Sequence, residues 1–114
     1  MTKTAFDDKD TADAGVYTCL DDMLTYVRAL RSDPPVSEQL FKRAWSPAEL
    51  DSGEKMHYGY GWEVSGDQIY HTGKWEGAST YLGLDLGNGS SIIVLSSIDD
   101  SAPPLAEAIE NLEP

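Results

Sequence analysis

The chain has 114 residues, of which 40% are hydrophobic and 10% aromatic, so it is long enough for one folded domain with a modest core. Its formal net charge of -12 repels phosphate backbones and anionic lipid headgroups, and no cluster of Lys or Arg offsets that charge, so we expect neither a nucleic-acid nor a membrane partner. The single cysteine, Cys19, excludes an intrachain disulfide and a thiolate metal cluster, while the absence of a signal-peptide pattern or a bilayer-spanning apolar run leaves the cellular location open.

Two parts of the chain differ in pattern. Residues 1–13 hold four aspartates without apolar periodicity, which predicts an acidic leader. Residues 14–114 alternate apolar runs with turn residues, which predicts a single domain.

Two helices are predicted in the first half of that domain. The first covers residues 18–31, because apolar residues recur there at intervals of three and four. They are Leu20, Met23, Leu24, Val27 and Leu30. Thr18 and Asp21 have the spacing of a capping box. Ser37 is expected to cap a second, shorter helix that ends before Pro47.

Short strands are predicted after residue 60. The runs 61–64 and 68–72 flank a Ser65-Gly66-Asp67 turn, which is typical of a hairpin. A glycine-bounded loop is expected from Gly73 to Gly77. Residues 78–86 then alternate apolar and polar side chains, which predicts a strand with one apolar face.

The last third of the chain predicts a hairpin and a closing helix. Asn88-Gly89 indicates a type I′ turn, and the continuous apolar run 92–95 predicts a strand covered on both faces. Two prolines precede an apolar stripe suited to a helix lying on the sheet. That stripe is Leu105, Ala108, Ile109 and Leu112. The expected fold class is α+β, an antiparallel sheet with packed helices.

One short motif could carry chemistry. His71-Thr72-Gly73 stands at the end of a predicted strand and is followed by Lys74 and Trp75. A glycine in a strand lets a ligand approach the backbone, and an imidazole and a hydroxyl project nearby. Taken alone the three residues are also compatible with local hydrogen bonding only.

The surrounding order of segments strengthens the motif. Ala14 to Thr18 leads into a helix, Tyr58-Gly59-Tyr60-Gly61-Trp62 follows, then the segment 70–77, then the strand 91–97. This series resembles the C-terminal region of the serine beta-lactamase family, which includes class C beta-lactamases, D,D-carboxypeptidases, D-aminopeptidases and related esterases. The resemblance covers roughly residues 14–112.

The resemblance implies roles for the motif. In that family the third active-site motif is Lys or His, then Thr or Ser, then Gly, on the strand that edges the active site. His71 and Thr72 would hold the substrate carboxylate or leaving group, and the N–H of Lys74, after Gly73, would be one of two oxyanion-hole donors. Of the three tryptophans, Trp75 is the best placed for substrate contact, because it directly follows the motif. Histidine, largely neutral near pH 7, attracts a carboxylate less than lysine does, which favours a peptidase or esterase over a penicillinase.

The family's nucleophile is not found in a credible place. Catalysis there begins at a Ser-x-x-Lys motif that opens a buried helix, N-terminal to this region. Ser52 to Lys55 spells Ser-x-x-Lys, but it falls in a predicted loop. His57 and His71 have no metal-site spacing, so we expect no metal and no other cofactor.

We therefore expect a partial serine hydrolase that is inactive alone. The missing N-terminal half of the hydrolase domain would complete it, or the chain would form a homodimer. The alternative is a free-standing module derived from the same fold, which binds a ligand or associates with itself without catalysis.

Overall fold

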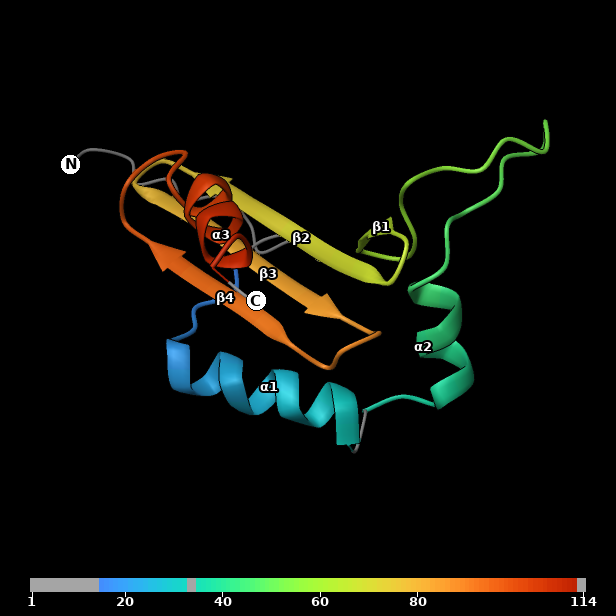
Figure 1. Ribbon diagram of the computed structural model, residues 1–114, viewed down its shortest axis with the longest axis horizontal. Helices are drawn as coiled ribbons and strands as arrows, with labels where there is room; N and C mark the ends of the chain where they lie inside the picture. Colours follow the sequence, from blue (N-terminus) through green and yellow to red (C-terminus); the bar gives the residue numbers. More distant parts are fainter. Residues whose placement is uncertain (1–14, 33–34, 113–114) are drawn as a thin grey trace.

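The computed structural model describes residues 15–32 and 35–112, so the acidic leader predicted for residues 1–13 lies outside the described residues. The elements are α1 (Leu20–Ser32), α2 (Glu38–Ala44), β1 (Glu63–Ser65), β2 (Gln68–Trp75), β3 (Ala78–Asp85), β4 (Ser91–Ser96) and α3 (Ala102–Glu110). The strands form one antiparallel sheet in the order β1-β2-β3-β4, with α3 across one face and α1 on the β4 side (Figure 1). The predicted α+β fold class is confirmed.

The sheet is built from tight hairpins. Gly66, at φ 58°, lies in the two-residue turn between β1 and β2, and Gly77, at φ 69°, lies in the one between β2 and β3. The expected loop from Gly73 to Gly77 is therefore wrong. Strand β2 continues to Trp75, which pairs with Ala78, because Gly73 is accommodated inside the strand and only the second glycine makes the turn.

The predicted type I′ turn at Asn88-Gly89 is also wrong. Five residues, 86–90, connect β3 to β4. A type I′ turn needs positive φ at both central residues, whereas Gly89 has φ 82° and Asn88 does not have a positive φ. The carboxylate of Asp85 instead accepts hydrogen bonds from the N–H groups of Gly87 and Asn88, at 2.8 and 3.0 Å.

Of the two predicted helix N-caps, one forms and the other does not. Ser37 caps α2 as predicted, accepting from the N–H of Leu40 at 3.3 Å. Helix α1 begins at Leu20, because the carbonyl of Cys19 accepts from Met23 at 3.0 Å. The capping box expected from Thr18 does not hold this end, since its hydroxyl donates to the Cys19 carbonyl.

Both faces of the sheet are covered by hydrophobic clusters. One cluster joins α1 to the sheet through Val27, Leu30, Trp62, Val64, Ile69 and Leu84. The other joins α3 to the opposite face through Val94, Ala102 and Ala106, with Tyr81, Ile92 and Ile109 packed against it. The run 92–95 contributes to both clusters, as expected. The prediction of one apolar face for 78–86 is wrong, because Tyr81 and Gly83 line the α3 side.

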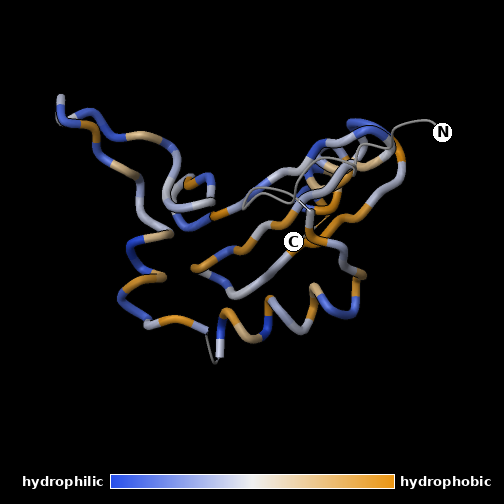
Figure 2. The backbone as a smooth tube through the Cα atoms, turned by 180° about the vertical axis from the view of Figure 1, so that it is seen from behind, coloured by the Kyte–Doolittle hydropathy of each residue, from blue (hydrophilic) through white to orange (hydrophobic). Residues whose placement is uncertain are grey.

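Only some residues of the two predicted apolar stripes are buried. Apolar and polar residues alternate along α1 (Figure 2), but Val27 and Leu30 are buried while Leu24 is 36% exposed. Helix α3 packs through Ala102 and Ala106, so most of the expected stripe faces outward and Leu112 is 82% exposed. Small alanines allow close approach to the sheet, and this contact outweighs burial of the leucines. No described helix is long and apolar enough to cross a membrane.

Candidate functional site

Part of strand β2 forms an edge of the sheet. Strand β1 has three residues and pairs only with residues 68–70 of β2. From His71 to Trp75, no strand in the described part of the chain pairs with β2 on the side away from β3. We call residues 71–74 the free edge, and Trp75 ends the strand beside it. The stretch 71–75 contains all five residues that the sequence singles out.

The register decides which backbone groups point outward there. In an antiparallel pair, every second residue directs its N–H and C=O toward the neighbouring strand. The two-residue turn at 76–77 closes on Trp75, so Trp75 and every second residue before it face β3. Thr72 and Lys74 fall between these residues, and their N–H and C=O groups are directed away from β3, to the free edge.

Gly73 is required by a close neighbour. It pairs with Thr80 of β3, and a Cβ at position 73 would occupy the space of the Thr80 hydroxyl. Trp75, expected in a loop, ends the strand and is 42% exposed.

The imidazole of His71 lies beside the ring of Tyr58. Its Nε2 lies 3.2 Å from the hydroxyl of Tyr58, and the two rings meet edge to face at 6.2 Å between centroids. Tyr58 belongs to the segment that precedes β1. Sequence reasoning used that segment only as a family marker and missed this contact.

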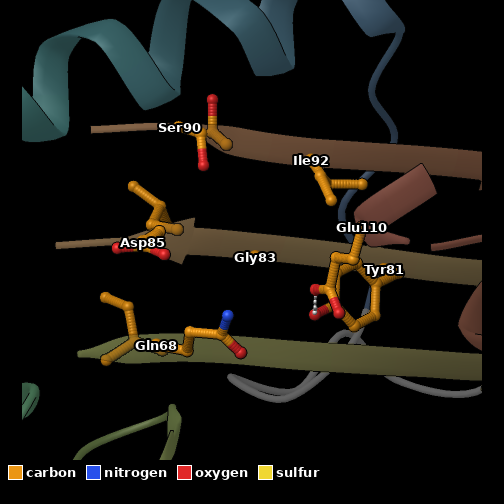
Figure 3. A pocket seen from close by; sticks show the side chains of 10 residues that line it. Gln68, Tyr81, Gly83, Asp85, Ser90, Ile92 and Glu110 are labelled. Atoms are coloured by element: carbon orange, nitrogen blue, oxygen red, sulfur yellow. Dashed lines mark hydrogen bonds between the residues drawn. The ribbon is translucent and has the colours of Figure 1, made fainter. Parts of the chain in front are cut away.

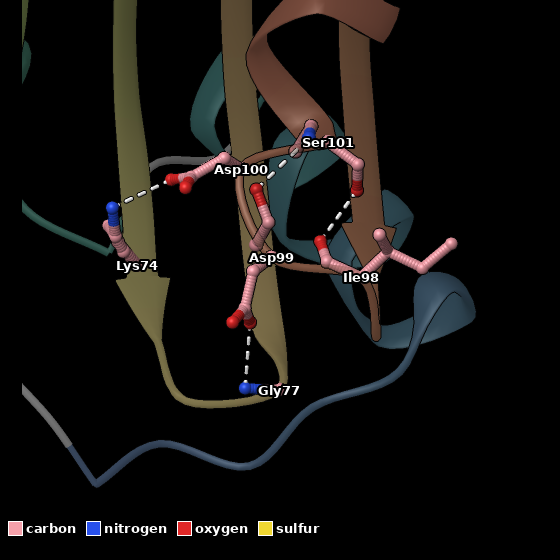
Figure 4. A network of polar contacts seen from close by, with 8 residues as sticks. Lys74, Gly77, Ile98, Asp99, Asp100 and Ser101 are labelled. Atoms are coloured by element: carbon pink, nitrogen blue, oxygen red, sulfur yellow. Dashed lines mark hydrogen bonds and ion pairs between the residues drawn. The ribbon is translucent and has the colours of Figure 1, made fainter.

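Two consecutive carboxylates hold the tip of the β2–β3 hairpin (Figure 4). Asp100 pairs with the ammonium of Lys74 at 2.8 Å, and Asp99 accepts from the N–H of Gly77 at 2.8 Å. The hydrogen bond to Asp100, with its charge and that of Asp99, raises the pKa of Lys74 above its ordinary value. The Lys74 side chain is thus directed to Asp100, while its backbone N–H is directed to the free edge. No sequence pattern pointed to these aspartates.

The loop that carries the two aspartates is itself anchored. Ser79 of β3 is 2% exposed, and its hydroxyl accepts from the N–H of Ala102 at 3.0 Å. The hydroxyl of Ser101 donates to the Ile98 carbonyl at 2.7 Å. The start of α3 is therefore fixed to the strand that pairs with the motif.

The aromatic and glycine-rich segment 58–62 has a structural reason for its glycines. A Cβ at Gly59 would collide with the carbonyl oxygen of Ala44, at the end of α2. Gly61 adopts φ 76°, a conformation that other residues rarely take. Trp62 is buried in the α1 cluster, so this segment fixes Tyr58 against the sheet.

The loop between α2 and β1 projects from the sheet beyond α2 (Figure 1), and its sequence includes Ser52 and Lys55. Both are exposed, and Ser52 lies in a turn that is closed by the pairing of Glu49 with Lys55. The family's serine opens a buried helix, which this turn does not provide. Among the described residues, no group of three or more His, Cys, Asp or Glu side chains could hold a metal ion.

A separate hollow lies on the α3 face (Figure 3). The ring of Tyr81 lies over Gly83, and its hydroxyl donates to Glu110 at 3.2 Å. Burial raises the pKa of Tyr81 to about 12, and the charge of Glu110 acts in the same direction. No residue of the free edge lines this hollow, so it is not part of the candidate site.

Comparison with known proteins identifies the family of the chain. The sequence model of the family described as Beta-lactamase matches residues 2–113, and the chain belongs to this family. The resemblance drawn from the motifs is confirmed at the level of the family. The chain is also similar to Penicillin-binding protein 4* of Bacillus subtilis (strain 168), with 29% identity over 93 residues. That match covers 77% of this chain and 21% of the relative, so the chain spans about a fifth of its length. No solved structure matches the chain.

Proposed function

We propose that this chain supplies one side of the acyl-transfer site of a serine hydrolase, with the nucleophile coming from a segment outside these 114 residues. His71 and Thr72 bind the acyl substrate, and the N–H of Lys74 is an oxyanion donor. Trp75 contacts the substrate from the end of the strand. The overall reaction is hydrolysis of an amide, ester or lactam through an acyl-serine intermediate.

The observation that carries this proposal is the direction of the Lys74 N–H. A donor can stabilise an oxyanion only if it is held in place before the reaction and is not already used by the sheet. The register directs this N–H to the free edge, while the pairing with β3 fixes the strand that carries it. The ion pair with Asp100 holds the ammonium group of Lys74 away from this N–H.

Proline substitution tests the donor directly. Lys74→Pro removes the N–H, and an edge strand tolerates proline where the N–H faces away from the ladder. Lys74→Ala removes the same side chain but keeps the N–H. With an N-terminal half that bears a Ser-x-x-Lys helix added, we expect acylation by a penicillin probe to be about 10²–10³-fold faster in Lys74→Ala than in Lys74→Pro. Equal rates would contradict the assigned role.

A second candidate function is a module that associates through β4, without catalysis. Strand β4 is an outer strand of the sheet, yet its run 92–95 has the apolar composition of an interior strand. Since Ile92 and Val94 pack toward α3, Ile93 and Leu95 lie on the opposite face, where Leu95 is 38% exposed. A strand from a second copy, giving a homodimer, or from the N-terminal half of a hydrolase would cover this edge.

Light scattering at increasing protein concentration separates these candidates. A homodimer that Leu95→Lys dissociates, with no acylation in any mixture, favours the associating module. A strictly monomeric, folded chain that becomes acylable only with the N-terminal half favours the hydrolase.

A further inference from the structure

Tyr58 is held at the free edge by its backbone and not only by its side chain. Its carbonyl accepts from the N–H of Ala48 at 2.8 Å, and it bridges to Glu63 at the start of β1. A Cβ at the next residue, Gly59, would collide with the Ala44 carbonyl oxygen, and the N–H of Tyr60 donates to that oxygen at 3.0 Å. The hydroxyl that meets His71 is therefore presented by a fixed segment.

His71 is held from the other side by the sheet. It pairs with Leu82 in the middle of the β2–β3 ladder, so its Cα cannot move away from Tyr58 without breaking the strand. Within the part of the chain that the structure describes, Tyr58 is the one residue that hydrogen-bonds to the ring, through Nε2. Nδ1 is then the ring nitrogen that remains for a ligand.

We propose that Tyr58 is a positioning residue that selects the tautomer of His71. The phenol O–H donates to Nε2, so the proton of the neutral ring resides on Nδ1. In this tautomer the ring presents an N–H donor, at Nδ1, to an accepting oxygen at the free edge. A carbonyl, ester or carboxylate oxygen of an acyl substrate fits this donor, and this last step rests on the proposed function.

The chain offers unusually direct controls for this proposal. It has two histidines, so His57 reports in the same spectrum on changes that are not specific to the site. Tyr60 is a matched control tyrosine, since its hydroxyl accepts a hydrogen bond from the guanidinium of Arg43 at 3.3 Å. Tyr58→Phe keeps the aromatic ring and removes only the hydroxyl.

The experiment is long-range proton–nitrogen correlation on the isotope-labelled chain, at about pH 8.5, well above the range in which histidines ordinarily titrate. We expect His71 to carry its proton on Nδ1 in the wild-type chain and in Tyr60→Phe. In Tyr58→Phe it should shift toward the Nε2–H form that histidine prefers in water, with His57 unchanged. An unchanged melting temperature shows that Tyr58→Phe has not unfolded the segment.

The same tautomer of His71 in the wild-type chain and in Tyr58→Phe would overturn the proposal, as would a wild-type ring protonated on Nε2. This readout does not depend on catalysis. If the tautomer shifts as expected but no N-terminal half restores acylation, the proposed function fails while the role of Tyr58 stands. If acylation is restored but Tyr58→Phe does not shift the tautomer, the role of Tyr58 fails while the proposed function stands.

Discussion

The hydroxyl of Thr80 occupies the space in which a Cβ at Gly73 would lie, across the β2–β3 pair. Replacement of glycine by alanine in a strand ordinarily stabilises a protein slightly, through the unfolded state. Here we expect Gly73→Ala to destabilise the chain by about 1–3 kcal/mol, because overpacking outweighs that gain. Urea denaturation measures the difference.

A double-mutant cycle isolates the cause. In the Thr80→Ala background the colliding hydroxyl is absent, and the remaining neighbour, the Cβ of residue 80, lies at an ordinary 3.6 Å. Gly73→Ala should then cost about 1 kcal/mol less than in the wild-type chain. Equal costs in the two backgrounds would mean that the glycine is needed for another reason.

Alanine substitutions at a buried and at a partly exposed leucine should differ in their effect on stability. Leu84 is 2% exposed in the α1 cluster, so Leu84→Ala should cost about 2–5 kcal/mol. Leu24 is partly exposed, and Leu24→Ala should cost only about 1 kcal/mol, less than the apolar periodicity alone suggests. A larger loss at Leu24 than at Leu84 in denaturation midpoints would contradict the observed packing.

Alkaline pH should destabilise the chain partly through Tyr81. Its pKa is raised from 10.0 to about 12, chiefly by burial. Between these two values the unfolded chain loses a proton that the folded chain keeps, so the free energy of unfolding falls as the pH rises. Tyr81→Phe should remove part of this loss, and Glu110→Gln should reduce it. Tyr26→Phe, on the exposed side of α1, serves as the control. Identical pH profiles for all four chains would refute the assignment.

The loop that clamps the hairpin tip should tolerate glycine at position 100. Asp100 adopts φ 57°, a left-handed conformation that costs most residues about 1–2 kcal/mol. Asp100→Gly and Asp100→Ala both remove the ion pair with Lys74, so their difference reports the backbone alone. We expect Asp100→Gly to be the more stable by about 1 kcal/mol in thermal or urea denaturation. Equal stability would show that the loop relaxes.

The sequence alone predicts the fold class and the approximate positions of the helices and strands, because these depend on local periodicity, whereas the predictions for two of the connections between strands are wrong. Gly73 shows where such reasoning fails. A glycine inside a strand looks like a loop boundary until the partner strand and Thr80 are known. The prediction for the buried face of α3 is wrong for a related reason. The alanine side of the helix faces the sheet, where Tyr81 packs against the same cluster, and this partner is not visible in the local sequence.

In the candidate site too, the motif residues are predictable from the sequence and their contacts are not. The residues 71–75 can be singled out by motif, but the outward direction of the Lys74 N–H follows only from the register. The partners Tyr58 and Asp100 come from segments with no chemical motif. Tyr58 lies 13 residues before His71 in the sequence, and Asp100 lies 26 residues after Lys74. Tertiary packing alone brings them to the strand.

Intact-mass measurement after exposure to a fluorophosphonate probe and to penicillin tests the half-site account most directly. An oxyanion donor accelerates acylation only when a nucleophile and its base lie within reach. We predict no adduct on the chain alone, and an adduct on the serine of a Ser-x-x-Lys half when that half is added. An adduct on the isolated chain that maps to Ser52 and disappears in Ser52→Ala would contradict the account.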